Sequence, residues 1–203
     1  MALFDNLTIF ILLTLGSYLL GSISFGLIIS RILNLGDLRS IGSGNTGATN
    51  VLRTGNKKAA LFTLLLDAGK GALVVYLGIS FFDSFTVNFM ALAVFIGHLF
   101  PVWQKFKGGK GVATLFGIAL VISFSAGLLT CLTWLLVAVV FRKSSLSALL
   151  GALFIPLWLW VFNEPDFIVL FTLLNVFVFI KHRENIKRLI DGTETNISFV
   201  RRS

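Results

Sequence analysis

Three polar segments of this sequence gather side chains that bind anions, and the first of them runs from Arg39 to Arg53. It reads RSIGSGNTGATNVLR, so glycines, hydroxyls and amides lie between two arginines. Glycine accepts positive φ, which lets successive backbone N–H groups converge on an anion. The spacing of Gly42, Gly44 and Gly47 also matches a dinucleotide-binding fingerprint, but no strand is predicted before it and no βαβ unit after it. The alternative is an ordinary polar turn between membrane spans, which needs far fewer hydrogen-bond donors.

The second segment, residues 97–114, places Gly108, Gly109, Lys110 and Gly111 directly before an apolar run. Backbone N–H groups at a helix N-terminus bind phosphate, and a lysine ammonium adds charge to such a site. The run is not a Walker A loop, because Gln104 stands where that motif requires its first glycine. The pattern therefore indicates a phosphate rather than a nucleoside triphosphate. The alternative is a basic, flexible membrane turn.

The third segment, residues 181–194, follows the last apolar run and reads KHRENIKRLIDGTE. On a helix, His182, Asn185 and Leu189 share one face. A basic stretch after a last span commonly does no more than anchor the topology, which is the alternative here. The chain has two histidines, so His98 and His182 are the imidazoles available as a general base.

The rest of the chain has the composition of a membrane protein. Hydrophobic residues make up 56% and charged residues 13%, the formal net charge is +8, and the mean hydropathy is +0.92. The apolar content overrules the nucleic-acid partner that a basic soluble protein would indicate, so we expect none. The length leaves room for about six to eight spans and no soluble appendage, which predicts one integral membrane domain over residues 1–203. A single cysteine, Cys131, gives no sign of an oxidising compartment.

Seven apolar segments predict an all-α bundle of seven transmembrane helices. They are residues 7–33, 59–82, 85–103, 112–124, 126–141, 146–162 and 167–180. Residues 112–141 form one nearly unbroken apolar run, which as a single helix would be about 45 Å long against about 30 Å of hydrocarbon. The small and polar residues from Ser123 to Gly127 offer a break within it.

The distribution of basic residues favours seven spans over six. With seven, every connection that carries Lys or Arg lies on one side, and the other side holds only Asp and Glu. With six, Arg142 and Lys143 would lie opposite Lys110. The positive-inside rule therefore predicts an N-terminus outside and a C-terminus in the cytoplasm. We interpret Arg142, Lys143, Arg201 and Arg202 as topology anchors.

Two ionisable residues, Asp67 and Lys70, lie inside the second apolar segment at a spacing of three. Charges there are costly unless they are paired or face a polar cavity. We interpret them as a structural ion pair that supports the first polar segment, with direct catalysis as the alternative. Polar residues otherwise keep to the three inside segments, which favours a surface active site over a transporter of a phosphorylated metabolite. A CDP-alcohol phosphotransferase would need several metal-binding aspartates, and we expect no metal site.

Taken together, the three segments resemble one family. The residues that carry the resemblance are 42–45, 48–50, 53, 97–98, 100–101, 108–111, 182–186, 188–189, 192 and 194, with residues 21–23 and 67–71 in support. They are similar, in this order, to the bacterial membrane acyl-phosphate:glycerol-3-phosphate acyltransferases of the PlsY type.

The resemblance implies an activity and a location. The reaction would transfer an acyl chain from acyl phosphate to the 1-position of sn-glycerol 3-phosphate, giving 1-acyl-glycerol 3-phosphate and phosphate with no cofactor. This is the first acylation of phospholipid biosynthesis. The site would lie on the cytoplasmic face of the bacterial inner membrane, in contact with the lipid bilayer. An enzyme that makes acyl phosphate is a candidate protein partner.

The resemblance also implies roles for individual residues. The expected catalytic residues are Ser43, Arg53, Lys110, His182 and Asn185. The expected substrate-binding residues are Gly42, Gly44, Asn45, Asn50, His98, Gly108, Gly109, Gly111, Ser145, Arg188 and Glu194. Lys110 and the neighbouring glycine backbone would hold the donor's phosphate, while Arg53 with Ser43 and Asn45 would bind the acceptor. The His-x4-Asp dyad of acyl-CoA or acyl-carrier-protein dependent acyltransferases is absent, because Trp103 stands five residues after His98. We therefore expect a substrate phosphate to accept the hydroxyl proton.

Overall fold

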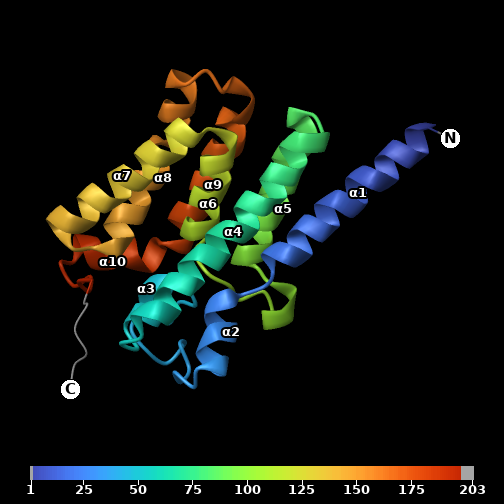
Figure 1. Cartoon of the computed structure of the whole chain (residues 1–203). Helices are drawn as coiled ribbons and strands as arrows, with labels where there is room; N and C mark the ends of the chain where they lie inside the picture. The colour runs from blue at the N-terminus through green and yellow to red at the C-terminus, as the bar shows by residue number, and fades with distance from the viewer. Residues whose placement is uncertain (1, 198–203) are drawn as a thin grey trace.

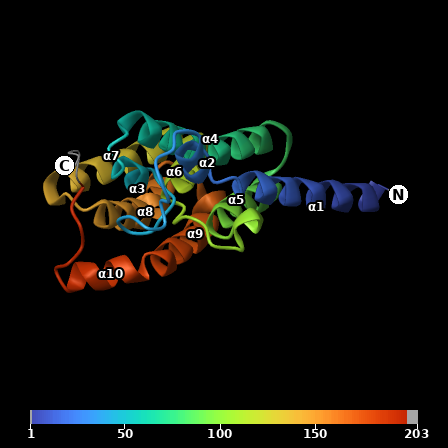
Figure 2. The ribbon, with the colours of Figure 1, turned by 90° about the horizontal axis from the view of Figure 1, so that it is seen from below.

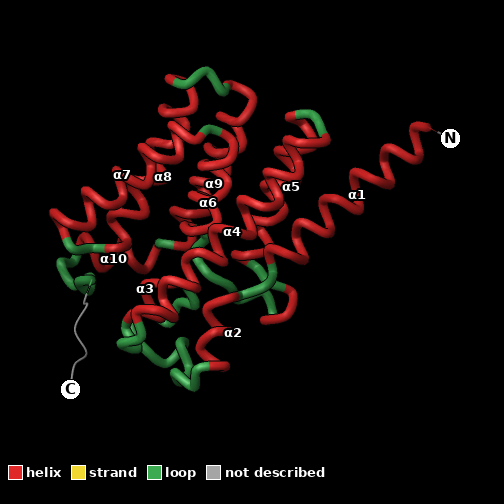
Figure 3. Tube along the Cα trace, viewed as in Figure 1, coloured by secondary structure: helices red, strands yellow, loops and turns green. Residues whose placement is uncertain are grey.

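The computed structural model describes residues 2–197 and is helical, with no strand in that part of the chain (Figures 1 and 3). The long helices are α1 (Ala2–Gly21), α4 (Lys57–Phe81), α5 (Ser84–Leu99), α6 (Val112–Ile122), α7 (Phe124–Phe141), α8 (Ser144–Val161) and α9 (Ile168–Lys181). The short ones are α2 (Phe25–Ile32), α3 (Ala48–Leu52) and α10 (Arg183–Ile190), with 3-10 turns at Val102–Gln104 and Pro165–Phe167. The all-α prediction is confirmed. Arg201 and Arg202 lie outside the described residues.

Six of the seven predicted apolar segments each match one long helix, the first is divided between α1 and α2, and the break predicted near residue 123 is present. Ser123 has extended backbone angles, and its side chain caps the start of α7 by accepting a hydrogen bond from the N–H of Ala126. In residues 2–197, five helices are long and apolar enough to cross a membrane, or six if Pro165–Lys181 and Arg183–Ile190 form one bent span. α6 has 11 residues and is about 17 Å long, roughly half the hydrocarbon thickness. Seven full crossings therefore stay a prediction.

The first apolar segment differs from the single regular helix that its composition suggested. It is interrupted at residues 22–24, between α1 and α2. The interruption frees backbone carbonyl groups, and Lys70 Nζ of α4 donates hydrogen bonds to two of them, Gly21 O at 2.9 Å and Ile23 O at 2.6 Å. Asp67 Oδ1 lies 3.1 Å from the same ammonium. The pair thus supports the chain where it turns toward the first polar segment.

The long connections gather at one end of the bundle, the lower end in Figure 1, which we call the polar end. Residues 33–47, 100–111 and 191–197 lie there, together with α2, α3 and α10. The short connections around Asp83 and Glu164 lie at the opposite end, where α1 also begins. Figure 2, seen from below, shows the segment after α10 running back past α8 and α7. The three polar segments of the sequence therefore meet on one side of the bundle.

The core lies where α5, α6, α8 and α9 pack together. Its largest fully buried side chains include Phe95, Leu115, Ile155 and Phe171. Leucines on the outer faces of α1, α4 and α7 are exposed by contrast, as expected of helices that face lipid rather than water. Two residues of the polar segments lie at the polar-end termini of these packed helices, namely Lys110 just before α6 and Ser145 in the first turn of α8.

Candidate active site

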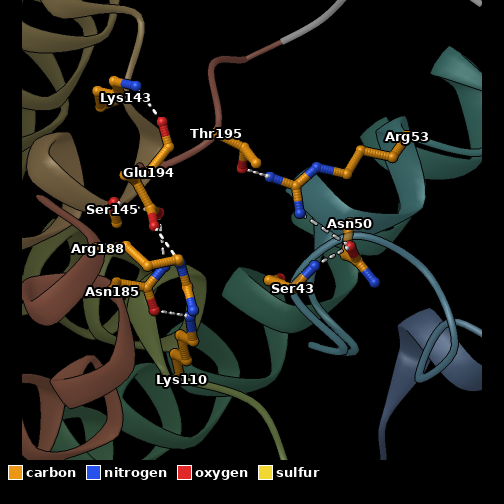
Figure 4. Close-up of polar contacts among 10 residues, drawn as sticks. All are labelled: Ser43, Asn50, Arg53, Lys110, Lys143, Ser145, Asn185, Arg188, Glu194 and Thr195. Atoms are coloured by element: carbon orange, nitrogen blue, oxygen red, sulfur yellow. Dashed lines mark hydrogen bonds and ion pairs between the residues drawn. The ribbon is translucent and has the colours of Figure 1, made fainter. Parts of the chain in front are cut away.

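A cleft of about 410 Å³ at the polar end brings the three polar segments together. Eleven of the predicted site residues line it: Ser43, Asn45, Asn50, Arg53, His98, Lys110, Gly111, Ser145, His182, Asn185 and Glu194. Gly42, Gly44, Gly108, Gly109 and Arg188 are not among its lining residues. The polar part of the cleft divides into two groups of hydrogen-bonded side chains, which Figure 4 shows.

The first group, which we call the arginine cluster, consists of Ser43, Asn50, Arg53 and Thr195. Asn50 is buried in the middle of α3, and its Nδ2 donates to Leu38 O at 2.7 Å. Its Oδ1 accepts from Arg53 Nη1 at 3.1 Å and from the N–H of Ser43 at 3.3 Å. The second guanidinium nitrogen, Nη2, donates to Thr195 Oγ1 at 2.7 Å. Arg53 is thereby held from two sides with its planar fork in the cleft.

Glycine is required at position 42 so that the first loop can pass beside this arginine. Gly42 has φ +55°, and a Cβ atom there would lie 2.5 Å from Arg53 Nη1 and 2.6 Å from Asn50 Oδ1. A side chain would displace both groups. Gly42 therefore leaves the space that the Arg53 and Asn50 side chains occupy, and it does not itself line the cleft.

The second group, the glutamate cluster, consists of Lys110, Ser145, Asn185, Arg188 and Glu194. The Glu194 carboxylate accepts from Ser145 Oγ at 2.7 Å, from Asn185 Nδ2 at 2.6 Å and from Arg188 Nε at 2.7 Å. Lys110 Nζ donates to Asn185 Oδ1, so the amide links the lysine to the carboxylate. Residues from the loop before α6, from α8 and from α10 are thus tied into one network.

The charges of the two clusters favour an anion in the cleft. The pKa of Lys110 is lowered to about 8, chiefly because the ammonium is buried; the nearby Glu194 raises the pKa, and Arg188 and Arg53 lower it. Burial alone would raise the pKa of Glu194, but the hydrogen bonds from Ser145, Asn185 and Arg188 outweigh it and lower the pKa. Three cationic side chains therefore surround one ionised carboxylate. A phosphate dianion would balance that excess of positive charge.

The glycines before α6 have a different role from the predicted one. The N–H groups of Gly108 and Gly109 donate to Leu99 O at 3.2 Å and His98 O at 3.1 Å, which are free carbonyl groups at the end of α5. A Cβ atom on Gly109 would lie 2.2 Å from His98 Nε2. These two N–H groups thus have partners within the protein, and the phosphate cradle that they were expected to form stays a prediction. Lys110 and the first turn of α6, which begins after Gly111, remain for that purpose.

The two histidines differ in what they contact. His182 is buried in the turn between α9 and α10, and its Nδ1 lies 2.8 Å from Val178 O. Because a carbonyl oxygen only accepts, Nδ1 carries the hydrogen and Nε2 is left as an acceptor. His98 is buried beside Asp67, with Nδ1 3.7 Å from Asp67 Oδ1. Both histidines line the cleft, but His182 keeps a free acceptor nitrogen there, whereas His98 lies against Asp67 of the buried ion pair.

Sequence reasoning missed Thr195, which lines the cleft, and the contact that Lys143 makes with Glu194. Thr195 contacts Arg53, although a lone threonine in a polar stretch carries no local signal. Lys143 was interpreted as a topology anchor, but its Nζ also donates to the backbone oxygen of Glu194. Lys143 lies directly before α8 and two residues before the predicted site residue Ser145, and this spacing was the one sign that it could reach the site. In residues 2–197 no group of three or more His, Cys, Asp or Glu side chains is placed to hold a metal ion, and a metal-free site stays a prediction.

Comparison with known proteins gives a consistent family. The family model described as glycerol-3-phosphate acyltransferase matches residues 11–192. The curated glycerol-3-phosphate acyltransferase of Dinoroseobacter shibae is 50% identical over 191 residues, 94% of each chain. That of Rhodopseudomonas palustris strain HaA2 is 52% identical over 189 residues, 93% of this chain and 96% of the relative.

Two solved structures share the fold. One is the crystal structure of PlsY (YgiH), an integral membrane glycerol 3-phosphate acyltransferase, in its glycerol 3-phosphate form. It superposes with a TM-score of 0.89 at 37% sequence identity, over 93% of this chain and 96% of that one. The lysophosphatidic acid form gives a TM-score of 0.87 at 36% identity, over 94% and 96%. The similarity covers nearly the whole of both chains.

Proposed function

The chain belongs to the glycerol-3-phosphate acyltransferase family, and from this membership we propose that it uses acyl phosphate as the acyl donor. The acceptor is the 1-hydroxyl of sn-glycerol 3-phosphate, and the products are 1-acyl-glycerol 3-phosphate (lysophosphatidic acid) and inorganic phosphate. The PlsY structures named for their glycerol 3-phosphate and lysophosphatidic acid forms support the acceptor and the product by analogy.

The observation that carries the donor assignment is the pair of cationic clusters in one cleft. Arg53 lies in one cluster and Lys110 in the other, and both residues line the same 410 Å³ space. Acyl phosphate and glycerol 3-phosphate each carry one phosphate, so two phosphate sites are what this pair of substrates needs. Arg53 suits the acceptor because its planar fork binds a phosphate through two parallel hydrogen bonds. Lys110 supplies a point charge for the donor's phosphate.

The cleft continues into an apolar groove that suits the acyl chain. Its floor is α6, with Phe116 and Leu120, and its walls are α4, with Leu64, and α7, with Cys131 and Trp134. These helices are packed side by side with α6 between the other two. An acyl chain placed there would lie against apolar surface while its phosphate stays at Lys110.

The reaction then requires positioning and charge stabilisation rather than a strong nucleophile. The acceptor hydroxyl attacks the acyl carbonyl carbon, a new C–O ester bond forms, and the bond from that carbon to the phosphate oxygen breaks. The departing phosphate gains negative charge next to the Lys110 ammonium, which stabilises it. A phosphate oxygen accepts the hydroxyl proton. Ser43 and Asn185, one in each cluster, would orient the two substrates.

We also propose that the whole chain is one integral membrane domain with seven crossings in the bacterial inner membrane. α1 begins at the end of the bundle opposite the polar end, which is compatible with an odd number of crossings. The basic residues Lys57, Lys58, Lys105 and Lys107 flank helices at the polar end. The positive-inside rule then places the cleft at the cytoplasmic face.

The test is acyl transfer by the purified protein in lipid nanodiscs. Palmitoyl phosphate and radiolabelled glycerol 3-phosphate should give labelled lysophosphatidic acid and inorganic phosphate in equal amounts. Palmitoyl-CoA at the same concentration is the control donor, and we expect no product from it. Product formed only from palmitoyl-CoA would overturn the donor assignment while leaving the acceptor intact.

A further inference from the structure

We propose that Thr195 binds the acceptor's phosphate together with Arg53, and that residues 192–197, here called the strap, hold the two clusters at a fixed separation. This inference rests on the proposed function, because it assigns Arg53 to the acceptor. Thr195 lies three residues beyond the part of the chain that the family model matches, residues 11–192.

The strap connects the clusters through two consecutive side chains. Glu194 accepts the three hydrogen bonds that define the glutamate cluster, and the next residue, Thr195, reaches Arg53 in the arginine cluster (Figure 4). Residues 193–197 are neither helix nor turn. Glu194 and Thr195 are neighbours in the chain, and their side chains contact different clusters, so one strap residue serves each cluster. The peptide unit between Glu194 and Thr195 therefore limits how far the clusters can separate.

Backbone and side-chain bonds on both sides of Thr195 fix the strap itself. Before it, the N–H groups of Thr193 and Glu194 donate to Arg188 O at 2.8 and 3.0 Å. After it, the N–H of Ile197 donates to Arg142 O at 2.7 Å. Lys143 Nζ donates to the backbone oxygen of Glu194. Thr195 is thus presented from a segment tied to α10 and to the start of α8.

The chemistry of the Thr195 hydroxyl suits a shared phosphate. A guanidinium group only donates, so Thr195 Oγ1 accepts from Arg53 Nη2 and keeps its own hydrogen for another acceptor. Both side chains line the cleft. A phosphate oxygen held by the Arg53 fork can accept that hydrogen, so the hydroxyl aligns the arginine and binds the same ligand.

The rival explanation is that the contact only tethers the strap. A tether predicts that removing the hydroxyl lowers stability and leaves substrate affinity unchanged. A binding residue predicts a higher KM for glycerol 3-phosphate, an unchanged KM for acyl phosphate, and recovery when a hydroxyl is restored.

The experiment compares T195V, T195A and T195S in nanodiscs, with T193V as the matched control. Thr193 is exposed on the same strap and does not line the cleft, so the same chemical change there should leave both KM values unaltered. For T195V and T195A we expect the KM for glycerol 3-phosphate to rise about fivefold, because a single partly exposed hydrogen bond contributes about that much to affinity. We expect kcat to stay within about twofold of the wild type. T195S should stay within about twofold of the wild type.

Direct titration of glycerol 3-phosphate into each variant separates this inference from the proposed function. A wild-type protein that binds glycerol 3-phosphate but does not react with palmitoyl phosphate would refute the donor assignment and leave the Thr195 test valid. Affinities of T195V and T195A equal to the wild type would overturn the inference. So would equal rises in both KM values, or a T195S variant as weak as T195V.

Discussion

Two lysine–carboxylate groups in this protein use the same residue types for different purposes. Lys70 pairs with Asp67 inside α4: its ammonium lies 3.1 Å from Asp67 Oδ1 and donates hydrogen bonds to Gly21 O and Ile23 O. Two of the three donors of this ammonium group are thus used in hydrogen bonds, and the ion pair engages its charge. In residues 2–197, Lys110 Nζ makes one hydrogen bond, to Asn185, and faces the cleft. Both lysines are largely buried, so it is the number of donors left free that separates the structural cation from the ligand-binding one.

The strongest test of this difference is to remove Lys110, the lysine whose donors are largely free. We expect Lys110→Ala to lower kcat/KM about 10³-fold, since it removes the charge that stabilises the departing phosphate. The protein should still fold, because the Glu194 carboxylate keeps its bonds from Ser145, Asn185 and Arg188. Transfer kinetics and thermal unfolding in nanodiscs measure the two properties. A stable variant with more than a tenth of wild-type kcat/KM would contradict the role of Lys110.

The second substitution removes Lys70, the cation of the buried ion pair. Lys70→Met leaves the Asp67 carboxylate buried without its partner and two carbonyl groups of the α1–α2 break without donors, so we expect a loss of about 3–5 kcal/mol in the free energy of unfolding. The double variant Asp67→Asn, Lys70→Met should recover part of that loss, because no buried charge remains. Unfolding in a denaturant series measures both. If Lys70→Met kept wild-type stability but lost activity, the pair would be catalytic and the comparison would fail.

The pH dependence of kcat/KM tests whether the charge of Lys110 is needed in the cleft. The pKa of Lys110 is lowered from 10.5 to about 8, so its ammonium is charged below that pH and neutral above it. We expect kcat/KM, which reports the free enzyme, to fall about fivefold between pH 8 and pH 9 after correction for spontaneous acyl phosphate hydrolysis. In Lys110→Arg this fall in kcat/KM should be absent, since a guanidinium group stays charged at pH 8 to 9. A wild-type profile that stays flat to pH 9.5 would show that Lys110 does not need its charge.

The same contrast explains what the sequence could and could not reveal. Helices and the break at Ser123 follow from local patterns of apolar and small residues, and the Asp67–Lys70 pair follows from its spacing. The break between α1 and α2 could not be read locally, because Lys70 stabilises it from another helix. Likewise, the N–H groups of Gly108 and Gly109 bond to the end of α5, a partner that only the packing identifies.

Within the cleft, the residue types were predictable and their partners were not. Glu194 and Asn185 were expected in substrate contact, and the structure shows them bonded to each other. A pattern of polar residues indicates that a site exists. It does not indicate which donors are consumed inside the protein, and that distinction decides which residues can bind a ligand.

The smallest expected effect tests how far the glutamate cluster depends on each of its bonds. Ser145→Ala removes one of the three hydrogen bonds to the Glu194 carboxylate, and we expect kcat/KM to fall about threefold, as for one neutral donor to a charged acceptor that keeps two others. Ser147→Ala is the matched control, since Ser147 Oγ donates to Lys143 O within the same helix and does not line the cleft. It should leave kcat/KM within about 1.5-fold of the wild type. Equal losses in the two variants would mean that α8 acts through its stability alone. A larger loss in Ser145→Ala that disappears in the Glu194→Gln background would show that the hydroxyl acts through the carboxylate, because two residues in one network are not additive.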